Sequence, residues 1–434
     1  MALDADRLGG DASAAAYDTA MVTPFLPDDE KIPAIREALP ATSAGIYLNT
    51  GTAGPLPRET ARAMAEAEGW ELSTGRADAN FYQDSLQRRA EARAAIAAVI
   101  GTDAAHVALT HAATDGMNIA AWAVDWKPGD RVVTTNLEHA GGMGPLWAVR
   151  ERFGVELVIA DIGLGADPAA TLAAMDRAIV PGTRLVSLSH VTWATGAVLP
   201  IAEIVELAHS RGALVAVDGA QAVGAIPVAV EHLGVDFYAL PGQKWLLGPE
   251  GMGAVYCADS VLDGPRVSFA GYWSFESIDL AANGKLWPDA RRFEGAVLHG
   301  PSVLGLARSA AWLSMFVGLP WIHERTALLA GATAEMLAEI PGVEVLTPRA
   351  SMAGLVTFRL SGWRSSAALR ELAQRTLCIA RTIPPLDAVR ISVGFFNTGS
   401  ELRRFRDGVA LVAGHTPETI PHRARIEVLR GGVE

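Results

Sequence analysis

Between residues 106 and 257, short apolar runs rich in β-branched residues alternate with stretches of helical periodicity. Most of the runs lack polar alternation, as is typical of strands that are covered on both faces. Such a pattern favours parallel strands joined by right-handed helical crossovers. We therefore expect an α/β fold with a mostly parallel, doubly wound, seven-stranded sheet. Its strands are expected at 106–110, 131–135, 155–160, 184–189, 213–217, 235–239 and 252–257, and its helices at 115–124, 144–153, 168–179 and 201–211.

The sequence beyond about residue 300 has a different texture. Two long Ala- and Leu-rich helical stretches, 302–316 and 322–339, precede short strands near 343–346, 354–360, 377–380 and 389–393 and one further helix at 365–376. This order is typical of a smaller α+β domain. The expected regions are an N-terminal arm (1–28), an N-terminal part of the small domain (29–58), a large domain (59–300) and a C-terminal small α+β domain (301–434).

Composition narrows the classes of function. The 36 basic and 48 acidic residues give a net charge of −12, so the chain lacks the basic face that nucleic acid binding requires. Two cysteines in 434 residues exclude a disulfide framework and favour a reducing, cytoplasmic location. The most apolar stretch, 309–321, is too short to cross a membrane, and the acidic N-terminus is unlike a signal peptide. No metal-ligand spacing such as His-Glu-x-x-His occurs.

Ligands of an open parallel sheet bind beyond the carboxyl ends of its strands. After the run 106–110, Ala113 and Thr114 open a helix whose free backbone N–H groups and dipole favour an anion. After 131–135 comes His139, which is placed to stack on a planar ligand or to transfer a proton. Taken singly, each has an ordinary explanation: a capped helix and a structural histidine.

Two charged residues follow later strands. Asp218 ends the apolar run 213–217, where a buried carboxylate requires a cation or a capping role. Lys244 lies between apolar neighbours after 235–239 and is a candidate Schiff-base amine, although surface lysines are common.

Pyridoxal 5′-phosphate (PLP) requires these four parts together: a helix N-terminus for phosphate, a histidine against the ring, a carboxylate for the ring nitrogen and a lysine for the aldehyde. Their joint occurrence at strand ends of one sheet favours a PLP enzyme over coincidence. A non-catalytic binding protein is less consistent with the pair Asp218 and Lys244. A nucleotide-binding dehydrogenase lacks support, because no Gly-x-Gly-x-x-Gly follows the first strand.

The chain resembles the class V aminotransferase family of fold-type I PLP enzymes, from Ile46 to Phe405. This family includes cysteine desulfurases, isopenicillin N epimerase-like proteins, kynureninases and C–S lyases. The resemblance rests on Asp-x-Ala-Gln at 218–221, Gln-Lys-Trp-Leu-x-Gly-Pro-x-Gly-x-Gly at 243–253 and the tail around Arg390. The segments SHVTWATG at 189–196 and RRFEGAVLHGP at 291–301 are most similar to the isopenicillin N epimerase-like branch.

The resemblance implies a role for each matching residue. Lys244 would bind PLP as a Schiff base and move the substrate's Cα proton, and Asp218 would keep the pyridine nitrogen protonated. Gln221 would hydrogen-bond the ring's phenolic oxygen, and His139 would stack on the ring. Arg390 would bind the substrate's α-carboxylate, a task suited to a guanidinium. The phosphate would be held by Ala113, Thr114 and Gln243.

The chain also departs from the family pattern. Trp193 stands where desulfurases place an asparagine, which leaves Thr192 or Thr195 for the contact with the cofactor and Trp193 for the substrate. Pro241 stands where many relatives have a serine and Val297 where they have a threonine, so the expected phosphate site loses hydroxyl donors. Gln243 replaces the usual histidine before the lysine. The resemblance implies a homodimer with shared active sites, in which 291–301 is the candidate for the donated segment.

Desulfurases need a mobile cysteine on a loop between the last strands. Cys378 lies inside an apolar run shortly before Arg390, and Cys257 ends the strand after the lysine. Both are expected to be small buried residues, so cysteine desulfuration is disfavoured.

β-Elimination on a cysteine S-conjugate or related amino acid of secondary or sulfur metabolism is the favoured reaction, because this branch is rich in C–S lyases. Transamination, epimerisation and decarboxylation stay open, since all act on the same bound amino acid. Five aromatic residues either hold a bulky substituent or serve packing: Trp193, Trp245, Tyr272, Trp273 and Phe275.

Overall fold

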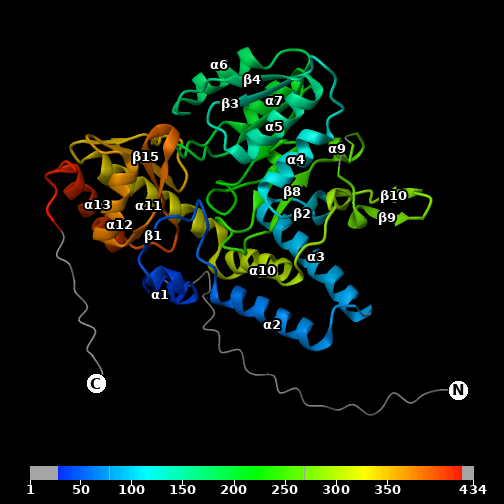
Figure 1. Cartoon of the computed structure of the whole chain (residues 1–434), viewed down its shortest axis with the longest axis horizontal. Coiled ribbons are helices and arrows are strands. Elements are labelled where there is room, and N and C mark those ends of the chain that lie inside the picture. The colour runs from blue at the N-terminus through cyan, green and yellow to red at the C-terminus, as the bar shows by residue number, and fades with distance from the viewer. Residues whose placement is uncertain (1–27, 78, 265, 268, 423–434) are drawn as a thin grey trace, which may run out of the picture.

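The computed structural model describes residues 28–77, 79–264, 266–267 and 269–422. The expected N-terminal arm therefore lies outside the described residues, apart from Asp28, which begins the first helix. The elements form a large lobe around one sheet and a smaller lobe around another (Figure 1).

A seven-stranded sheet in the order β2-β8-β7-β6-β5-β3-β4 forms the centre of the large lobe. Strands β3 to β7 run parallel to one another, and β8 runs antiparallel to both β2 and β7. This confirms the expected α/β fold with a mostly parallel sheet. The strands are β2 (Val107–Thr110), β3 (Arg131–Thr135), β4 (Glu156–Ala160), β5 (Thr183–Ser189), β6 (Leu214–Asp218), β7 (Phe237–Pro241) and β8 (Gly253–Cys257).

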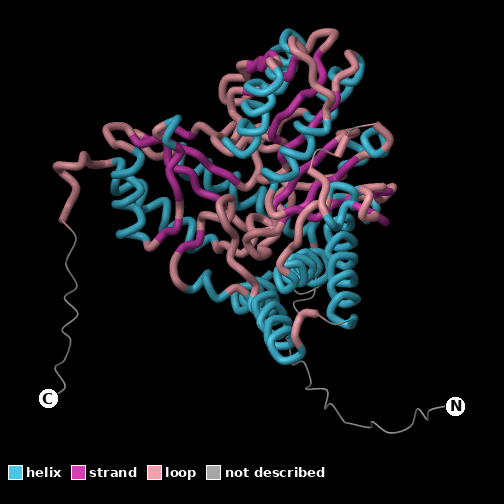
Figure 2. Tube along the Cα trace, turned by 45° about the vertical axis from the view of Figure 1, so that its right-hand side comes forward, coloured by secondary structure: helices cyan, strands magenta, loops and turns pink. Residues whose placement is uncertain are grey.

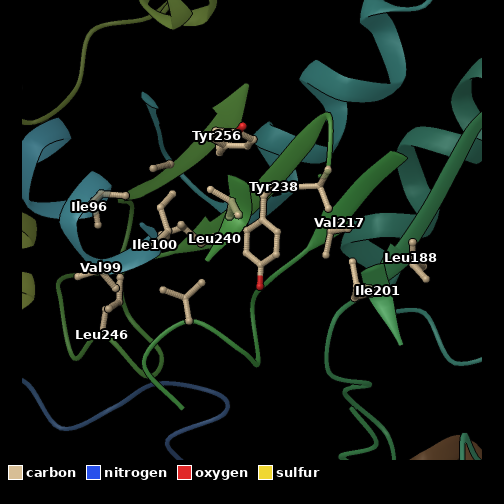
Figure 3. Close-up of a cluster of buried hydrophobic side chains, with 14 of the residues drawn as sticks. Ile96, Val99, Ile100, Leu188, Ile201, Val217, Tyr238, Leu240, Leu246 and Tyr256 are labelled. Carbon is tan, nitrogen blue, oxygen red and sulfur yellow. The ribbon is translucent and has the colours of Figure 1, made fainter. Parts of the chain in front are cut away.

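Helices cover both faces of this sheet. Successive residues of β6 point to opposite faces, so Val215 and Val217 join one hydrophobic cluster and Ala216 joins the other. Figure 3 shows the first cluster, where Tyr238 and Leu240 of β7 pack with Ile96 of a covering helix. The helices of the large lobe are α2 (Arg58–Thr74), α3 (Ala79–Ile100), α4 (Ala113–Ala123), α5 (Ala140–Phe153), α6 (Pro168–Ala178), α7 (Ile201–Ser210), α8 (Val230–Leu233), α9 (Asp259–Leu262) and α10 (Gly300–Ala311).

The smaller lobe contains a four-stranded antiparallel sheet in the order β11-β12-β15-β14. Its core includes Ile46 and Leu48, because β1 (Ile46–Tyr47) pairs in parallel with β13 (Cys378–Ile379). The four strands are β11 (Val343–Val345), β12 (Leu355–Leu360), β14 (Arg381–Ile383) and β15 (Ala388–Ser392). The helices nearby are α1 (Asp28–Ala38), α11 (Leu319–Ala338), α12 (Ser365–Thr376) and α13 (Gly399–Ala413). The expected domain boundaries stay a prediction.

Two features differ from the sequence-based expectations. The stretch 302–316 is helical as expected, but the helix changes type: α10 ends at Ala311, a π-helical segment continues it over Trp312–Val317, and Gly318 with φ +93° turns the chain into α11. A hairpin of β9 (Phe275–Ile278) and β10 (Gly284–Leu286) projects from the large lobe (Figures 1 and 2). It was not expected, because its mostly exposed residues lack an apolar pattern.

Among the described residues, no single helix is long and apolar enough to cross a membrane. The segments Gly300–Val317 and Leu319–Ala338 are long and apolar enough only when taken together, and the chain bends by 82° between them.

Candidate active site

The carboxyl ends of the central strands bring the predicted cofactor residues to one edge of the sheet. His139 follows β3 and caps α5, Asp218 is the last residue of β6, and Lys244 follows β7. Arg390 of the small sheet donates a hydrogen bond to the carbonyl of Trp193, whose ring meets that of His139, so the small sheet contributes to the same site as the large one. The site therefore lies between the two lobes.

The N-terminus of α4 is open to an anion. Its N-cap residue, Ala112, has no side chain that could satisfy the first backbone N–H groups, and Thr114 is exposed. The loop before α5 approaches it closely, because a Cβ on Gly141 would lie 2.6 Å from Thr114 Oγ1. These features fit a phosphate bound by Ala113 and Thr114.

Asp218 is a buried carboxylate with one described hydrogen bond. It is 6% exposed, and its Oδ1 accepts a bond of 2.9 Å from the backbone N–H of Ala220. The following glycine is required by packing, because a Cβ on Gly219 would lie 2.1 Å from Cε1 of Tyr238. A buried carboxylate with a single backbone donor is suited to meet a cationic ring nitrogen.

The surroundings of Lys244 lower the pKa of its amine and so favour the uncharged form. Burial lowers its pKa to about 8, the carboxylate of Asp218 opposes this shift, and the guanidinium groups of Arg390 and Arg381 add to it. An amine with this pKa is partly uncharged near neutral pH, which a nucleophilic or proton-accepting lysine requires.

His139 is held in one tautomer and stays neutral. Its Nδ1 accepts a hydrogen bond of 3.1 Å from the backbone of Gly141, which leaves the proton on Nε2. Burial is the main cause that lowers its pKa, and the charge of Lys244 is the next. Its ring meets that of Trp193 edge to face, with centroids 5.2 Å apart and an angle of 84°.

Gln221 and Thr192 are already engaged within the chain. Gln221 donates to the carbonyl of Gly51 at 2.8 Å and accepts from the indole N–H of Trp245 at 2.9 Å. Thr192 shares a bond of 2.7 Å with the hydroxyl of Thr195 and accepts one from Ala197. Neither arrangement tests the expected cofactor contacts, which stay predictions.

The phosphate candidate Gln243 differs from these two, because its Oε1 is buried without a partner among the described residues. Such an atom, next to Lys244 in sequence, fits a site that a ligand completes.

Arg390 is the most unusual group in the site. Its side chain is fully buried, its Nη1 donates to the carbonyl of Trp193 at 2.7 Å, and its Nε and Nη2 have no partner in the described chain. Burial lowers its pKa to about 9, and the nearby charge of Arg381 adds to this effect. Nε and Nη2 form one edge of the guanidinium fork, which matches a carboxylate bidentately.

Sequence reasoning missed two residues near this site. Glu138 accepts hydrogen bonds of 2.6 Å from Thr135 and Ser189, and burial raises its pKa to about 7. Arg381 acts electrostatically on Lys244, His139 and Arg390. The position of Glu138 next to His139 in the sequence could have indicated that it lies near the site. Arg381 becomes a candidate only from its strand pairing with Arg390.

Both cysteines are buried, as expected. Cys257, the last residue of β8, belongs to a hydrophobic cluster of the large lobe, and Cys378 belongs to the core of the small lobe. Burial raises the pKa of both thiols. The connection between β14 and β15 is the short segment 384–387, which contains no cysteine.

The aromatic candidates separate into two groups. Trp193 lies at the site, and Trp245 is buried against Gln221. Trp273 instead stacks on Tyr82 of α3, with centroids 5.7 Å apart. A cavity of about 460 Å³ begins beside the N-terminus of α4, where His111 and Asp115 line it, and extends to Phe269 and Phe293. None of the residues assigned to the cofactor ring lines it.

Comparisons with known proteins agree with this arrangement. Residues 46–405 match the family model described as aminotransferase class-V. The chain is 30% identical to isopenicillin N epimerase of Streptomyces clavuligerus over 391 residues, 85% of this chain and 95% of that protein. It is 27% identical to a probable cysteine desulfurase of Methanothermobacter thermautotrophicus over 397 residues, 88% of this chain and 98% of that protein. Several other relatives also carry the name cysteine desulfurase.

Solved structures show the same fold. The complex between the cystine C-S lyase C-DES and its reaction product cysteine persulfide has a TM-score of 0.81 and 27% identity, covering 86% of this chain and 99% of that chain. A C-DES variant with glycine covalently linked to its PLP cofactor also has a TM-score of 0.81.

Because the family model matches most of the chain, this protein belongs to the class V aminotransferase family. It is a PLP-dependent enzyme of fold type I. The described residues fit that cofactor: an uncapped helix N-terminus, a buried carboxylate and a lysine with a lowered pKa lie at one edge of the sheet.

Proposed function

We propose that this enzyme is a C–S lyase, which removes the sulfur substituent of a cysteine S-conjugate or related amino acid by β-elimination. The observation that carries the proposal is the free guanidinium edge of Arg390, buried within electrostatic reach of Lys244. This pair is suited to hold an α-carboxylate and to take a proton from the adjacent Cα.

Each residue has a defined task in this proposal. Arg390 binds the α-carboxylate and so directs the Cα–H bond toward Nζ of Lys244, which accepts the proton. Asp218 retains a proton on the ring nitrogen, and neutral His139 covers the ring. Bound PLP supplies an electron sink for the negative charge that develops at Cα.

The bond that breaks next is Cβ–S. Its electron pair leaves with the sulfur, which takes up a proton and departs as a thiol. Water then converts the remaining three-carbon enamine to pyruvate and ammonia. No oxidant and no thiol of the enzyme are needed for this sequence.

Cysteine desulfuration is less consistent with the site, although many relatives carry that name. Desulfuration requires an accessible cysteine to receive the substrate sulfur, and Cys257 and Cys378 are 0% and 5% exposed. C-DES, the cystine C-S lyase of similar fold, supports the lyase assignment.

Epimerisation is the second candidate, supported by the 30% identity to isopenicillin N epimerase. Transamination and decarboxylating deamination are further alternatives, and a binding or regulatory role is the non-enzymatic one. We also propose a cytoplasmic homodimer in which the segment 291–301, with Val297 74% exposed, completes the neighbouring site.

Product analysis of the PLP-loaded protein tests the proposal. The protein is incubated in deuterium oxide with S-ethylcysteine and, separately, with alanine, with and without a keto acid. Equal amounts of ethanethiol, pyruvate and ammonia support the lyase. Turnover that requires the keto acid would indicate an aminotransferase, deuterium at Cα without net loss would indicate an epimerase, and carbon dioxide would indicate decarboxylation.

A further inference from the structure

Two arginines lie directly opposite each other beside the site. Arg381 of β14 and Arg390 of β15 are partner residues in an antiparallel pair. Side chains of such partners lie on the same face of the sheet, with Cβ atoms about 4.5–5.5 Å apart. Like charges at this spacing repel each other, so the pair requires a compensating anion.

Neither arginine finds that anion within the described chain. The described hydrogen bonds of Arg381 go to the hydroxyl of Thr52 at 3.3 Å and to the carbonyl of Thr382 at 3.4 Å. Arg390 donates only to the carbonyl of Trp193. In contrast, Arg359 on the neighbouring strand β12 pairs with Glu344 at 3.4 Å.

Both arginines also face the reacting groups. Their charges lower the pKa of Lys244 and of His139. Both also lie against Trp193. Arg390 donates a hydrogen bond to its carbonyl, and the guanidinium carbon of Arg381 lies 5.8 Å from the centroid of its ring. Arg390 is fully buried, whereas Arg381 is partly exposed and hydrogen-bonds the exposed Thr52. An amino acid held at Arg390 would therefore direct its side chain toward Arg381 and the solvent.

A single α-carboxylate occupies the free edge of Arg390 and leaves Arg381 without a counter-charge. We propose that Arg381 binds a second anionic group, located on the side chain of the substrate. The enzyme would therefore prefer amino acids with an acidic substituent, such as a cysteine S-conjugate that ends in a carboxylate. This inference rests on the proposed function for the identity of the reaction.

Two substrates of nearly equal shape and different charge test the assignment. S-Carboxymethylcysteine and S-carbamoylmethylcysteine have nearly the same shape and differ in one negative charge. The wild-type enzyme should favour the carboxylate in kcat/KM by about 10- to 100-fold, the range expected for a charge-assisted hydrogen bond. Arg381→Gln should abolish this preference through KM, because any change that the lost charge causes at Lys244 affects both substrates alike, whereas the control Arg359→Gln should retain the preference. Equal loss on both substrates would overturn the proposal, because Arg381 would then act on the α-carboxylate or on the fold.

Binding to the cofactor-free protein separates this proposal from the proposed function. Calorimetry should show that glutarate binds at least about 10-fold more tightly than butyrate, and that Arg381→Gln removes the difference. Equal affinities of the wild-type protein for the two acids would contradict the second anion site. If neither conjugate is turned over while glutarate is preferred, the lyase assignment fails and the anion site stands.

Discussion

Arg390 donates a hydrogen bond of 2.7 Å from Nη1 to the carbonyl oxygen of Trp193. This bond connects β15 of the small sheet to the loop after β5 of the large sheet. The indole of Trp193 in turn meets His139, which caps α5. Arg390, the proposed carboxylate-binding residue, is thus held by the segment that contacts His139, the residue proposed to cover the cofactor ring.

Arg390→Met should stabilise the cofactor-free protein while it abolishes substrate binding. The wild-type guanidinium is buried with two unpartnered nitrogens, and an apolar side chain of similar length removes that cost. We expect the free energy of unfolding to rise by about 1–3 kcal/mol. Urea denaturation measures the change. A loss of stability would show that Arg390 is compensated within the chain.

Glu138→Gln should alter how stability depends on pH. The folded state holds a proton on Glu138 up to about pH 7, whereas the unfolded state releases it near pH 4.5. The contribution of Glu138 is therefore complete below pH 4.5 and is lost as pH rises toward 7. Urea denaturation between pH 5 and 7 should show this fall in the wild type relative to the variant. Parallel curves for the two proteins would contradict the raised pKa.

Gly219→Ala should destabilise the protein, because its Cβ would lie 2.1 Å from the ring of Tyr238. That ring cannot move freely, since its hydroxyl shares a bond of 2.8 Å with His190. Overpacking of this kind costs about 1–3 kcal/mol. Gly331→Ala, on α11 with nothing within 4 Å, is the control and should gain about 0.5–1 kcal/mol. A melting temperature for Gly219→Ala at or above that of the wild type would refute the packing argument.

Removal of the thiols tests the choice between lyase and desulfurase. A Cys257→Ala, Cys378→Ala double variant should retain turnover within about twofold, because neither thiol is accessible. The measurement is the release of thiol and pyruvate from S-ethylcysteine, with circular dichroism as the check on folding. A folded double variant without activity would show that one of the two cysteines is needed for catalysis.

Local patterns predicted the central sheet well. The expected strand 131–135 coincides with β3, and the other strands of the large sheet are displaced by at most two residues at either end. These strands are covered on both faces, so their apolar runs carry a strong signal. The hairpin of β9 and β10 carries no such signal, because exposed residues are free to be polar.

The positions of some candidate site residues could be predicted, because a charged residue directly after an apolar strand is visible in the sequence, as for Asp218 and Lys244. Arg381 could not be found in this way. Its proposed role rests on the register that pairs it with Arg390, which is a long-range property of the fold. The engagement of Gln221 with Gly51 likewise joins residues 170 positions apart.

The location of the cofactor is the most direct test of the account. The chain contains four lysines, Lys31, Lys127, Lys244 and Lys285, so the attachment site can be mapped without ambiguity. The PLP-loaded protein is reduced with borohydride, digested and examined by mass spectrometry. We expect the cofactor on the peptide that contains Lys244, together with visible absorbance that Lys244→Ala loses. A cofactor attached to another lysine, or a wild-type protein that stays colourless with PLP, would contradict the account.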